Sequence, residues 1–277
     1  MDLAEDEAVR EDAAVAGSER PSKVVELLLR PRSLEASACD RSVFTVDSFA
    51  SPEECKALVD KAHQLLASYG KTYAQPARSR LSIVTPVDKV LRLRLLALME
   101  AELPEFAQAV FGQATDLAEL RPDYSPGEPA VNIYKKGGEF APHTDKRSVS
   151  LLVPLSDEGV AFEGGGTAFW PDSHLKRREN VADDESYNEL DRSNWLPHGH
   201  MLRPPTGTAI IFGGDVTHAG LPVTSGTRHL FVMSFTLCPG RIVEPVVAPP
   251  PEEAFIDSGD EADVADSLAD FADLLGE

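Results

Sequence analysis

Short apolar runs, separated by glycine, proline and aspartate, make up the chain from about Pro129 to Cys238. Five of these runs have the length and composition of β-strands: AVNIY, SVSLLVPL, GTAFW, GTAIIF and HLFVMSFTL. Several strands at such short spacing indicate a β-sandwich or a β-barrel. Because the preceding half of the chain has helical periodicity, the predicted fold class is α+β, mainly β.

The half of the chain before Pro129 carries helix signals. Ser51 precedes a proline and is followed three residues later by Glu54, which predicts a capped helix with an apolar stripe. A second helix is expected from Thr85, and PEFAQAVFG continues it to Gly112. The segment SKVVELLLRPRS is expected to form a short helix, while SVFTVDSFAS alternates like a short strand.

The negative charge of the chain is concentrated at its ends. The net charge is −20, and residues 251–277 carry ten acidic residues and no lysine or arginine. Residues 1–22 are acidic and lack apolar periodicity, so we expect a disordered segment. Residues 241–277 have the composition of a proline-rich linker and an acidic disordered tail. We therefore expect a single domain over residues 23–240.

Within that domain we expect helical support over about residues 42–128 and a β core over about residues 129–238. A polar stretch from Pro171 to Pro205 interrupts the β core and is too long for a hairpin turn. Insertions of this size on a β-scaffold tend to be lids or binding loops. We therefore treat residues 171–205 as an inserted loop.

Composition excludes several classes of partner. An acidic chain repels phosphate backbones, so no nucleic-acid partner is expected. The cysteines, Cys39, Cys55 and Cys238, have no paired spacing, which argues against a disulfide framework or a cysteine zinc site. No signal peptide and no apolar run of about 18 residues is recognised, so we predict no membrane partner and a cytoplasmic location. The oligomeric state is left open.

The stretch NIYKKGGEFAPHTDK contains a histidine and an aspartate separated by one threonine, His143 and Asp145. A spacing of two on a strand places both side chains on one face. The preceding glycine pair allows the backbone to turn, and Tyr134 lies on the neighbouring strand-like run. An H-x-D pattern alone occurs by chance too often to identify a site. A surface motif without function is therefore the alternative to a metal site.

A second histidine, His218, follows a Gly-Gly-Asp turn 75 residues after His143. Two histidines and one carboxylate form the facial triad of non-haem Fe(II) oxygenases, which leaves positions on the ion open for a bidentate co-substrate and O2. A structural zinc ion prefers four protein ligands, and no fourth is near in sequence. The pattern predicts His143, Asp145 and His218 as ligands of Fe(II).

Arg228 follows His218 by ten residues, with a turn predicted over PVTSG between them. Residues 228, 230, 232 and 234 then share one strand face, which we expect to point inward. A guanidinium inside a barrel needs a partner, because an unpaired buried charge is very costly. The far carboxylate of a dicarboxylic ligand is such a partner. A keto acid that chelates iron at one end and reaches Arg228 at the other is 2-oxoglutarate.

The order of these blocks resembles the Fe(II)/2-oxoglutarate-dependent dioxygenases and, among them, the prolyl 4-hydroxylase catalytic domains. The matching pieces span about residues 42–238: FTVDSFASPEECKALVDKA, NIYKKGGEFAPHTD, SLLVPLSDEGVAFEGGGTAFW, PPTGTAIIF and THAGLPVTSGTRHLFVMSF. The resemblance implies a double-stranded β-helix (jelly-roll) core with flanking N-terminal helices. It also implies that Arg228 anchors the distal carboxylate of 2-oxoglutarate, with Tyr134 and Thr167 as further contacts.

The resemblance further implies a dioxygenase that hydroxylates a C–H bond, with succinate and CO2 as co-products. Its cofactors would be Fe(II), 2-oxoglutarate as co-substrate, and ascorbate as reductant; O2 is the oxidant. The first expected substrate is a peptidyl proline in a peptide or protein, and a small molecule is the alternative. Two departures concern this substrate. Collagen-type enzymes usually carry lysine where this chain has Arg228, and the insertion at residues 171–205 is longer than expected.

Two further alternatives stay open at this point. Asn-x-Tyr before H-x-D also occurs in dioxygenases that dealkylate nucleic acids, but these usually carry a second arginine six residues after the first, where this chain has Ser234. A non-catalytic jelly-roll binding module with a relict triad is the alternative outside the enzymes. The other histidines of the β half are expected to be solvated or packing residues: His174, His198, His200 and His229.

Overall fold

The structure is a computed structural model that describes residues 23–29, 42–69, 77–171, 174 and 192–241. The acidic N-terminal segment, the expected linker and tail beyond residue 241, and Cys39 lie outside the described residues. Most of the expected inserted loop also lies outside them. Its described end contains the short 3-10 helix η3 (Arg192–Asn194) and the strand β10 (His200–Leu202).

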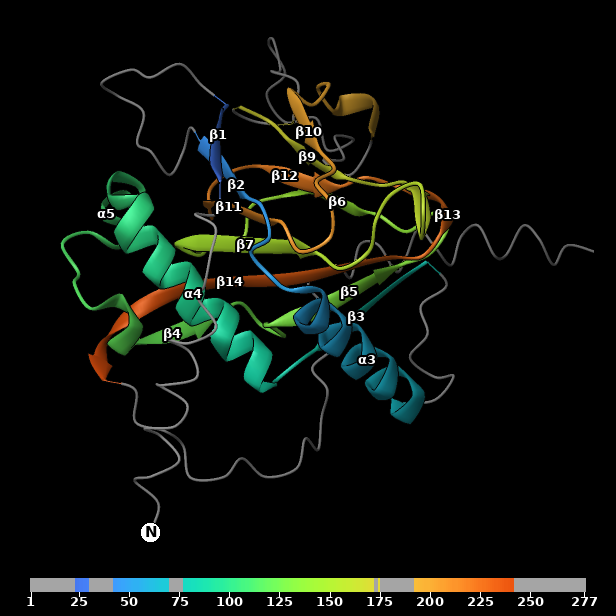
Figure 1. The fold of residues 1–277 in the computed structure, drawn as a ribbon. Coiled ribbons are helices and arrows are strands. Elements are labelled where there is room, and N and C mark those ends of the chain that lie inside the picture. Colours follow the sequence, from blue (N-terminus) through green and yellow to red (C-terminus); the bar gives the residue numbers. More distant parts are fainter. Residues whose placement is uncertain (1–22, 30–41, 70–76, 172–173, 175–191, 242–277) are drawn as a thin grey trace, which may run out of the picture.

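An eight-stranded antiparallel sheet forms the larger layer (Figure 1). Its strands follow the order β1-β2-β11-β7-β14-β5-β3, and β4 pairs with the far part of β14. The strand bounds are β1 Val24–Leu28, β2 Ser42–Val46, β3 Arg78–Ser82, β4 Leu120–Tyr124, β5 Ala130–Tyr134, β7 Val149–Pro154, β11 Ala209–Gly213 and β14 Arg228–Arg241.

A four-stranded antiparallel sheet forms the smaller layer, in the order β10-β9-β12-β6. Its other strands are β6 Phe140–His143, β9 Thr167–Phe169 and β12 His218–Gly220. A separate two-stranded ribbon pairs β8 (Phe162–Gly164) with β13 (Val223–Gly226).

The chain alternates between the two sheets as it proceeds. Strands β5, β7, β11 and β14 belong to the larger sheet, and β6, β9 and β12, which come between them in sequence, belong to the smaller one. This alternation winds the chain as a double-stranded β-helix. The predicted α+β, mainly β fold with a jelly-roll core is confirmed.

The residues of β14 show how the larger sheet acquires two different faces. Phe231, Met233 and Phe235 join the hydrophobic core on the outer side of the sheet, while Leu230 and Val232 join the core inside the jelly-roll. Successive residues of a strand point to opposite faces of the sheet. Because β14 has apolar residues at successive positions, both faces of the sheet are buried along this strand. The predicted inward direction of residues 228, 230, 232 and 234 agrees with this packing.

Three helices cover the outer face of the larger sheet (Figure 1). They are α3 (Pro52–Tyr69), α4 (Pro86–Glu102) and α5 (Pro104–Phe111), and the 3-10 helix η2 (Leu117–Glu119) leads into β4. The predicted capping box of α3 is confirmed. The Ser51 hydroxyl accepts from the Glu54 N–H at 3.2 Å, and the Glu54 carboxylate accepts from the Ser51 N–H at 2.8 Å.

The segment SKVVELLLRPRS forms the strand β1 and not the predicted helix. Residues Val24–Leu28 pair antiparallel with Ser42–Val46 over their whole length. The strand begins with two β-branched valines, which favour extended backbone. A single short helix is marginal in water, whereas pairing with β2 satisfies the backbone groups of one strand edge.

The second predicted helix ends earlier than expected. α4 stops at Glu102, and α5 starts anew at Pro104, because proline has no N–H to continue the hydrogen bonds and its ring clashes with the preceding turn. Gly112 then ends α5 with a φ of 68°, a left-handed conformation that favours glycine.

Two predictions from the sequence missed strands that the structure contains. The residues PVTSG were predicted as a turn, but Val223–Gly226 forms β13, and the turn follows at Gly226, whose φ is 77°. An antiparallel partner, β8, supplies the backbone hydrogen bonds that local sequence does not reveal. Strands β3 and β4 lie within the segment that was predicted as helical support.

Two smaller expectations concern membranes and thiols. In the part of the chain that the structure describes, no helix has both the length and the apolar character needed to cross a membrane. Cys55 and Cys238 are free thiols. Burial raises the pKa of Cys55 to about 11, so this thiol stays protonated and packs as a small apolar group.

Candidate metal and co-substrate site

Two neighbouring strands of the smaller sheet bring His143 and His218 together. His143 ends β6, His218 begins β12, and the two residues are direct partners in the antiparallel register of these strands. Their ring centroids are 4.3 Å apart. Phe140 and Phe212 pack against the two imidazoles, at 4.2 and 4.7 Å between centroids. Strand pairing thus brings together two histidines that are 75 positions apart in the sequence.

Asp145 lies beyond the end of β6, in a loop, so the expectation that both H-x-D side chains leave one strand face is wrong. The Asp145 N–H donates to the Gly214 carbonyl at 2.9 Å, which joins this loop to the turn before β12. Gly214 has to be glycine here, because a Cβ would lie 1.8 Å from the carbonyl oxygen of Arg147. The Gly-Gly-Asp turn therefore fixes the carboxylate relative to His218.

The donor atoms of His143, Asp145 and His218 converge on one point. Asp145 Oδ1 lies 3.4 Å from His143 Nε2, and Oδ2 lies 3.7 Å from His218 Nε2. All three residues offer donor atoms within 4.8 Å of one another. A transition-metal ion binds imidazole and carboxylate at about 2 Å, so ligands at right angles lie about 3 Å apart. The spacing therefore fits a shared metal ion after a small contraction.

Hydrogen bonds orient each of the three side chains. The Nδ1 atoms of His143 and His218 lie 2.8 and 3.0 Å from the carbonyl oxygens of Ala141 and Val216. A carbonyl only accepts, so each Nδ1 carries the proton and each Nε2 lone pair is free for a ligand bond. The Ser150 hydroxyl donates to Asp145 Oδ2. These are the outer contacts by which proteins hold metal ligands in position.

The protonation states at neutral pH also suit metal binding. Burial lowers the pKa of His218 to about 4, and His143 adds to this effect while Asp145 opposes it. Burial alone would raise the pKa of Asp145, but His218, His143 and the Ser150 hydrogen bond together hold it below its usual value. Neutral imidazole and ionised carboxylate are the forms that bind metal ions. The donor set of nitrogen and oxygen, without sulfur, suits a 2-His-1-carboxylate iron site.

Arg228 begins β14 and is 4 % exposed. Its guanidinium donates to the Gly166 carbonyl at 3.1 Å and to the Thr167 hydroxyl at 3.3 Å, and its carbon Cζ lies 5.5 Å from the ring centroid of Tyr134. Burial lowers the pKa of Arg228, yet a guanidinium stays charged in proteins. Among the described residues, no carboxylate pairs with it.

The loop that receives Arg228 is built around glycine. Gly165 has a φ of 64°, and a Cβ there would lie 3.2 Å from Arg228 Cδ. Arg203 lies on the other side of this loop, where it donates to the Gly165 carbonyl at 3.1 Å and pairs with Glu158 at 2.9 Å. The charge of Arg203 is therefore matched, whereas no carboxylate of the described residues matches that of Arg228.

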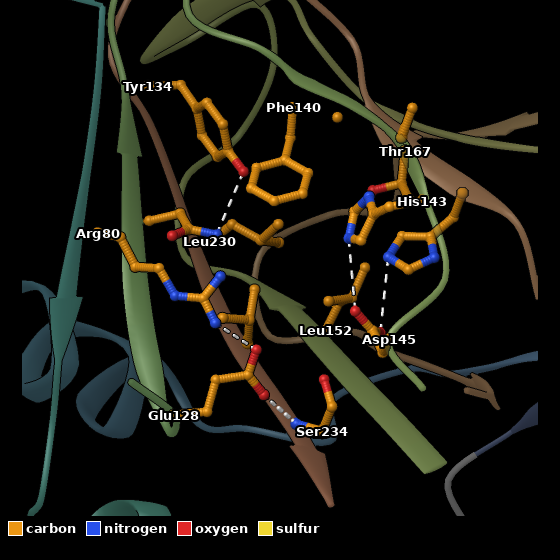
Figure 2. Close-up of a pocket in the computed structure, with 15 residues that line it drawn as sticks. Arg80, Glu128, Tyr134, Phe140, His143, Asp145, Leu152, Thr167, Leu230 and Ser234 are labelled. Carbon is orange, nitrogen blue, oxygen red and sulfur yellow. Dashed lines mark hydrogen bonds and ion pairs between the residues drawn. The ribbon is translucent and has the colours of Figure 1, made fainter. Parts of the chain in front are cut away.

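One cavity, of about 420 Å³ with its open mouth included, joins these groups. Figure 2 shows His143 and Asp145 on one side, Tyr134 and Thr167 at one end, and apolar side chains between them. Arg228 itself is not among the lining residues but contacts two of them, Thr167 and Tyr134. The apolar part of the lining consists of Phe140, Leu152, Ala219, Leu230 and Val232. The cavity is called the barrel cavity below.

The barrel cavity also contains an ion pair that sequence reasoning missed. Arg80 Nη2 lies 2.5 Å from Glu128 Oε1, and the other Glu128 oxygen accepts from the Ser234 N–H. Burial raises the pKa of Glu128, which Arg80 opposes and Asp145 reinforces. Asn132 donates to the Tyr134 hydroxyl at 3.2 Å. The alternation RSRLSI at residues 78–83 was the available signal, since it predicts a strand with arginines on one face.

The histidines other than His143 and His218 are not part of the candidate metal site. His63 of α3 and His229 of β14 meet outside the barrel, with their Nε2 atoms 3.1 Å apart. His174 and His198 each lie 6.1 Å from Trp170 between ring centroids. Within the described residues, His143, Asp145 and His218 are the only group of three or more potential metal ligands.

A family profile matches the part of the chain that contains these site residues. Residues 129–236 match the profile of the 2OG-Fe(II) oxygenase superfamily. No curated protein sequence matches the chain. Among solved structures, the crystal structure of a Pseudomonas putida prolyl-4-hydroxylase aligns with a TM-score of 0.42 and 16 % identity, over 70 % of this chain and 91 % of that one. The matched segment holds His143, Asp145, His218 and Arg228, so the chain is similar to the 2OG-Fe(II) oxygenase superfamily over the residues of the candidate site.

Proposed function

We propose that the protein is an Fe(II)- and 2-oxoglutarate-dependent dioxygenase that hydroxylates a C–H bond of a peptidyl proline, with succinate and CO2 as co-products. The observation that carries the proposal is one cavity that joins two features. The donor atoms of His143, Asp145 and His218 lie within 4.8 Å of one another at its side. A buried guanidinium without an acidic partner among the described residues, Arg228, lies behind its end.

In this proposal His143, Asp145 and His218 hold the iron. When bound, Fe(II) and 2-oxoglutarate supply the activation of O2 and the oxidation of the substrate C–H bond. The protein contributes orientation. The carbonyls of Ala141 and Val216 keep the Nε2 atoms unprotonated and aimed at the site. Three protein ligands leave the remaining positions on the ion free for the co-substrate and O2.

Arg228 neutralises the distal carboxylate of 2-oxoglutarate. Its present acceptors, the Gly166 carbonyl and the Thr167 hydroxyl, are both neutral, so the charge of the guanidinium is uncompensated. The hydroxyls of Thr167 and Tyr134 line the same end of the barrel cavity and act as further hydrogen-bonding groups for that carboxylate. An arginine at such a site holds a carboxylate in a bidentate geometry.

The apolar lining excludes water from the reacting atoms. Phe140, Leu152, Leu230 and Val232 line the barrel cavity. Such a lining strengthens the electrostatic interactions of bound groups and prevents side reactions with solvent. It also provides the contact surface for an aliphatic ring such as that of proline.

The proline assignment rests on the sequence resemblance to prolyl 4-hydroxylase catalytic domains. Among the alternatives, dealkylation of nucleic acid is disfavoured by Ser234. Dioxygenases that dealkylate nucleic acids usually carry a second arginine at this position. Here the Ser234 backbone N–H binds the carboxylate of Glu128, which repels phosphate.

We propose ascorbate as the reductant that keeps the iron in the Fe(II) state, and a cytoplasmic location.

The test is product formation with a defined stoichiometry. The purified protein is incubated with Fe(II), 2-oxoglutarate, ascorbate and a library of proline-containing peptides. Succinate and products heavier by one oxygen atom are then measured by mass spectrometry. We expect succinate only when Fe(II) and 2-oxoglutarate are both present, and one hydroxylated proline for each succinate beyond the peptide-free background. Succinate formation that survives His143→Ala would remove the proposed mechanism, and products on residues other than proline would remove the proposed substrate.

A further inference from the structure

The charged groups of Arg80 and Glu128 in the barrel cavity have no place in the proposed handling of iron or 2-oxoglutarate. Figure 2 shows them across the cavity from His143 and Asp145, with Leu152 and Leu230 in between. Arg80 comes from β3, and Glu128 immediately precedes β5. An ion pair inside a cavity is a costly feature, because desolvation of the two charges offsets much of their attraction. Its presence beside the reacting centre therefore points to a ligand.

The pairing leaves hydrogen-bonding groups unused. Within the described residues, Glu128 is the sole hydrogen-bond acceptor for the Arg80 guanidinium, through Nη2. Arg80 Nε and Asn132 Oδ1 are buried and have no hydrogen-bond partner there. Asn132 is 4 % exposed. Buried polar groups in folded proteins nearly always have partners, so the exceptions mark places where a ligand or water completes the bonding.

The β-sheet register places these unused groups next to each other. Arg80 of β3 and Asn132 of β5 are directly opposed in the antiparallel pair, and Asn132 is in turn opposed to Leu230 of β14. The site therefore offers a donor, the guanidinium, and an acceptor, the Asn132 carboxamide oxygen, on one side of the barrel cavity. A secondary amide, with one carbonyl and one N–H, complements this pair.

The charged side chains that line the barrel cavity favour a neutral amide over an anion as the group that binds next to Arg80. The lining of the barrel cavity carries one guanidinium, that of Arg80, and two carboxylates, those of Glu128 and Asp145. Glu128 already neutralises Arg80 at 2.5 Å. A carboxylate or phosphate of a substrate would have to compete with Glu128 for the guanidinium and would meet repulsion from that carboxylate. A neutral amide meets neither difficulty.

We propose that Arg80 and Asn132, with Glu128 holding the guanidinium in place, form a substrate-binding site for a backbone amide next to the residue that is hydroxylated. The inference rests on the proposed function and deepens it. It assigns peptides, and not free acids or nucleotides, as the substrate class, and it makes Arg80 and Asn132 substrate-binding residues. Glu128 is a positioning residue, because it acts through Arg80.

The experiment separates binding of peptide from binding of 2-oxoglutarate. The full chain with Fe(II) is assayed for succinate without peptide, and then with a mixture of N-acetylated, C-amidated pentapeptides that contain a central proline. Wild type is compared with Arg80→Met and with Arg80→Met/Glu128→Leu, which avoids leaving an unpaired buried carboxylate. Arg94→Met is the matched control, since Arg94 pairs with Glu54 at 2.9 Å outside the barrel cavity.

We expect both Arg80 variants to require at least about tenfold more peptide for half-maximal stimulation of succinate formation. Their peptide-free rate and the KM for 2-oxoglutarate should stay within about twofold of wild type, as should every parameter of Arg94→Met. A purely structural ion pair would change all of these parameters together, so this selectivity is the informative result.

Three results would overturn the inference. The first is unchanged peptide dependence in both Arg80 variants, and the second is an equal rise in the KM for 2-oxoglutarate, which would assign Arg80 to the co-substrate. The third is a wild-type protein that makes succinate but is stimulated by proline derivatives with a free carboxylate and not by blocked peptides. Wild-type protein that forms no succinate at all would instead overturn the proposed function and the inference with it.

Discussion

Replacing Arg228 with methionine should have opposite effects on ligand binding and on the stability of the ligand-free protein. The guanidinium is 4 % exposed, and its acceptors, the Gly166 carbonyl and the Thr167 hydroxyl, are neutral. Without co-substrate the buried charge is therefore unmatched, and its removal relieves a desolvation penalty. We expect the melting temperature of ligand-free Arg228→Met to be unchanged or higher than that of wild type.

The loss of binding can be estimated from the bonds removed. A hydrogen bond to a charged group contributes about 1.5 kcal/mol at the low end, so a bidentate pair contributes about 3 kcal/mol. That corresponds to a Kd for 2-oxoglutarate raised roughly 150-fold. A ligand present at about 100 times the wild-type Kd stabilises the native state by about 2.7 kcal/mol, and the same concentration would stabilise the variant by only about 0.3 kcal/mol. The ligand-induced shift in melting temperature should fall from about 5–10 °C to about 1 °C.

Calorimetric titration and thermal melts with 2-oxoglutarate, in the presence of Mn(II) as a redox-inert substitute for Fe(II), measure both quantities. The control is Arg203→Met, because Arg203 lies against the same glycine loop but is paired with Glu158. We expect the control to change the Kd less than about threefold, since the loop loses no free charge. A Kd of Arg228→Met within threefold of wild type would refute the assignment of this arginine as the anchor.

Three further predictions address the metal loop and the outer histidine pair. Gly214→Ala should abolish tight metal binding in a dialysis assay while far-ultraviolet circular dichroism stays native, because a Cβ 1.8 Å from the Arg147 carbonyl displaces the loop that holds Asp145; retention of one tightly bound metal ion would contradict this. Ser150→Ala removes the hydroxyl that donates to Asp145 and should weaken metal affinity about 10- to 100-fold; unchanged affinity would exclude a role for this bond. Burial, with His63 adding to it, lowers the pKa of His229 to about 4, so the unfolded chain binds more protons between about pH 6.5 and pH 4. Stability in urea should therefore fall on acidification through that window, by about 1 kcal/mol after solvent screening, and His229→Gln should flatten this slope.

The site residues that were predicted from the sequence each belong to a short sequence motif that can be recognised without knowing the fold. His143 is part of an H-x-D pattern at a strand end, and His218 follows a glycine turn that only a close backbone approach explains. Arg228 was predicted to bind a ligand because a buried strand face should not carry an unmatched charge, and the structure confirms that this residue is buried. The position of Asp145 beyond the strand could not be read, since it depends on a hydrogen bond to a residue 69 positions away, Gly214.

The ion pair in the barrel cavity shows what sequence alone leaves out. Arg80 and Glu128 are 48 residues apart, and the Ser234 N–H that holds the second oxygen of Glu128 is 106 residues further on. Neither separation corresponds to a local period. The partner of Arg80 is decided by where β3 and β5 join the sheet, and tertiary pairing of this kind also converted the predicted helix at Val24–Leu28 into strand β1.

The central claim is that two imidazoles and one carboxylate of this chain hold a single iron ion. Crystals grown without oxygen in the presence of Fe(II), measured on both sides of the iron absorption edge, test it directly. The account predicts one anomalous peak, about 2 Å from Nε2 of His143, Nε2 of His218 and a carboxylate oxygen of Asp145. A peak at any other group of residues, or no peak between these three side chains at full Fe(II) loading, would contradict it.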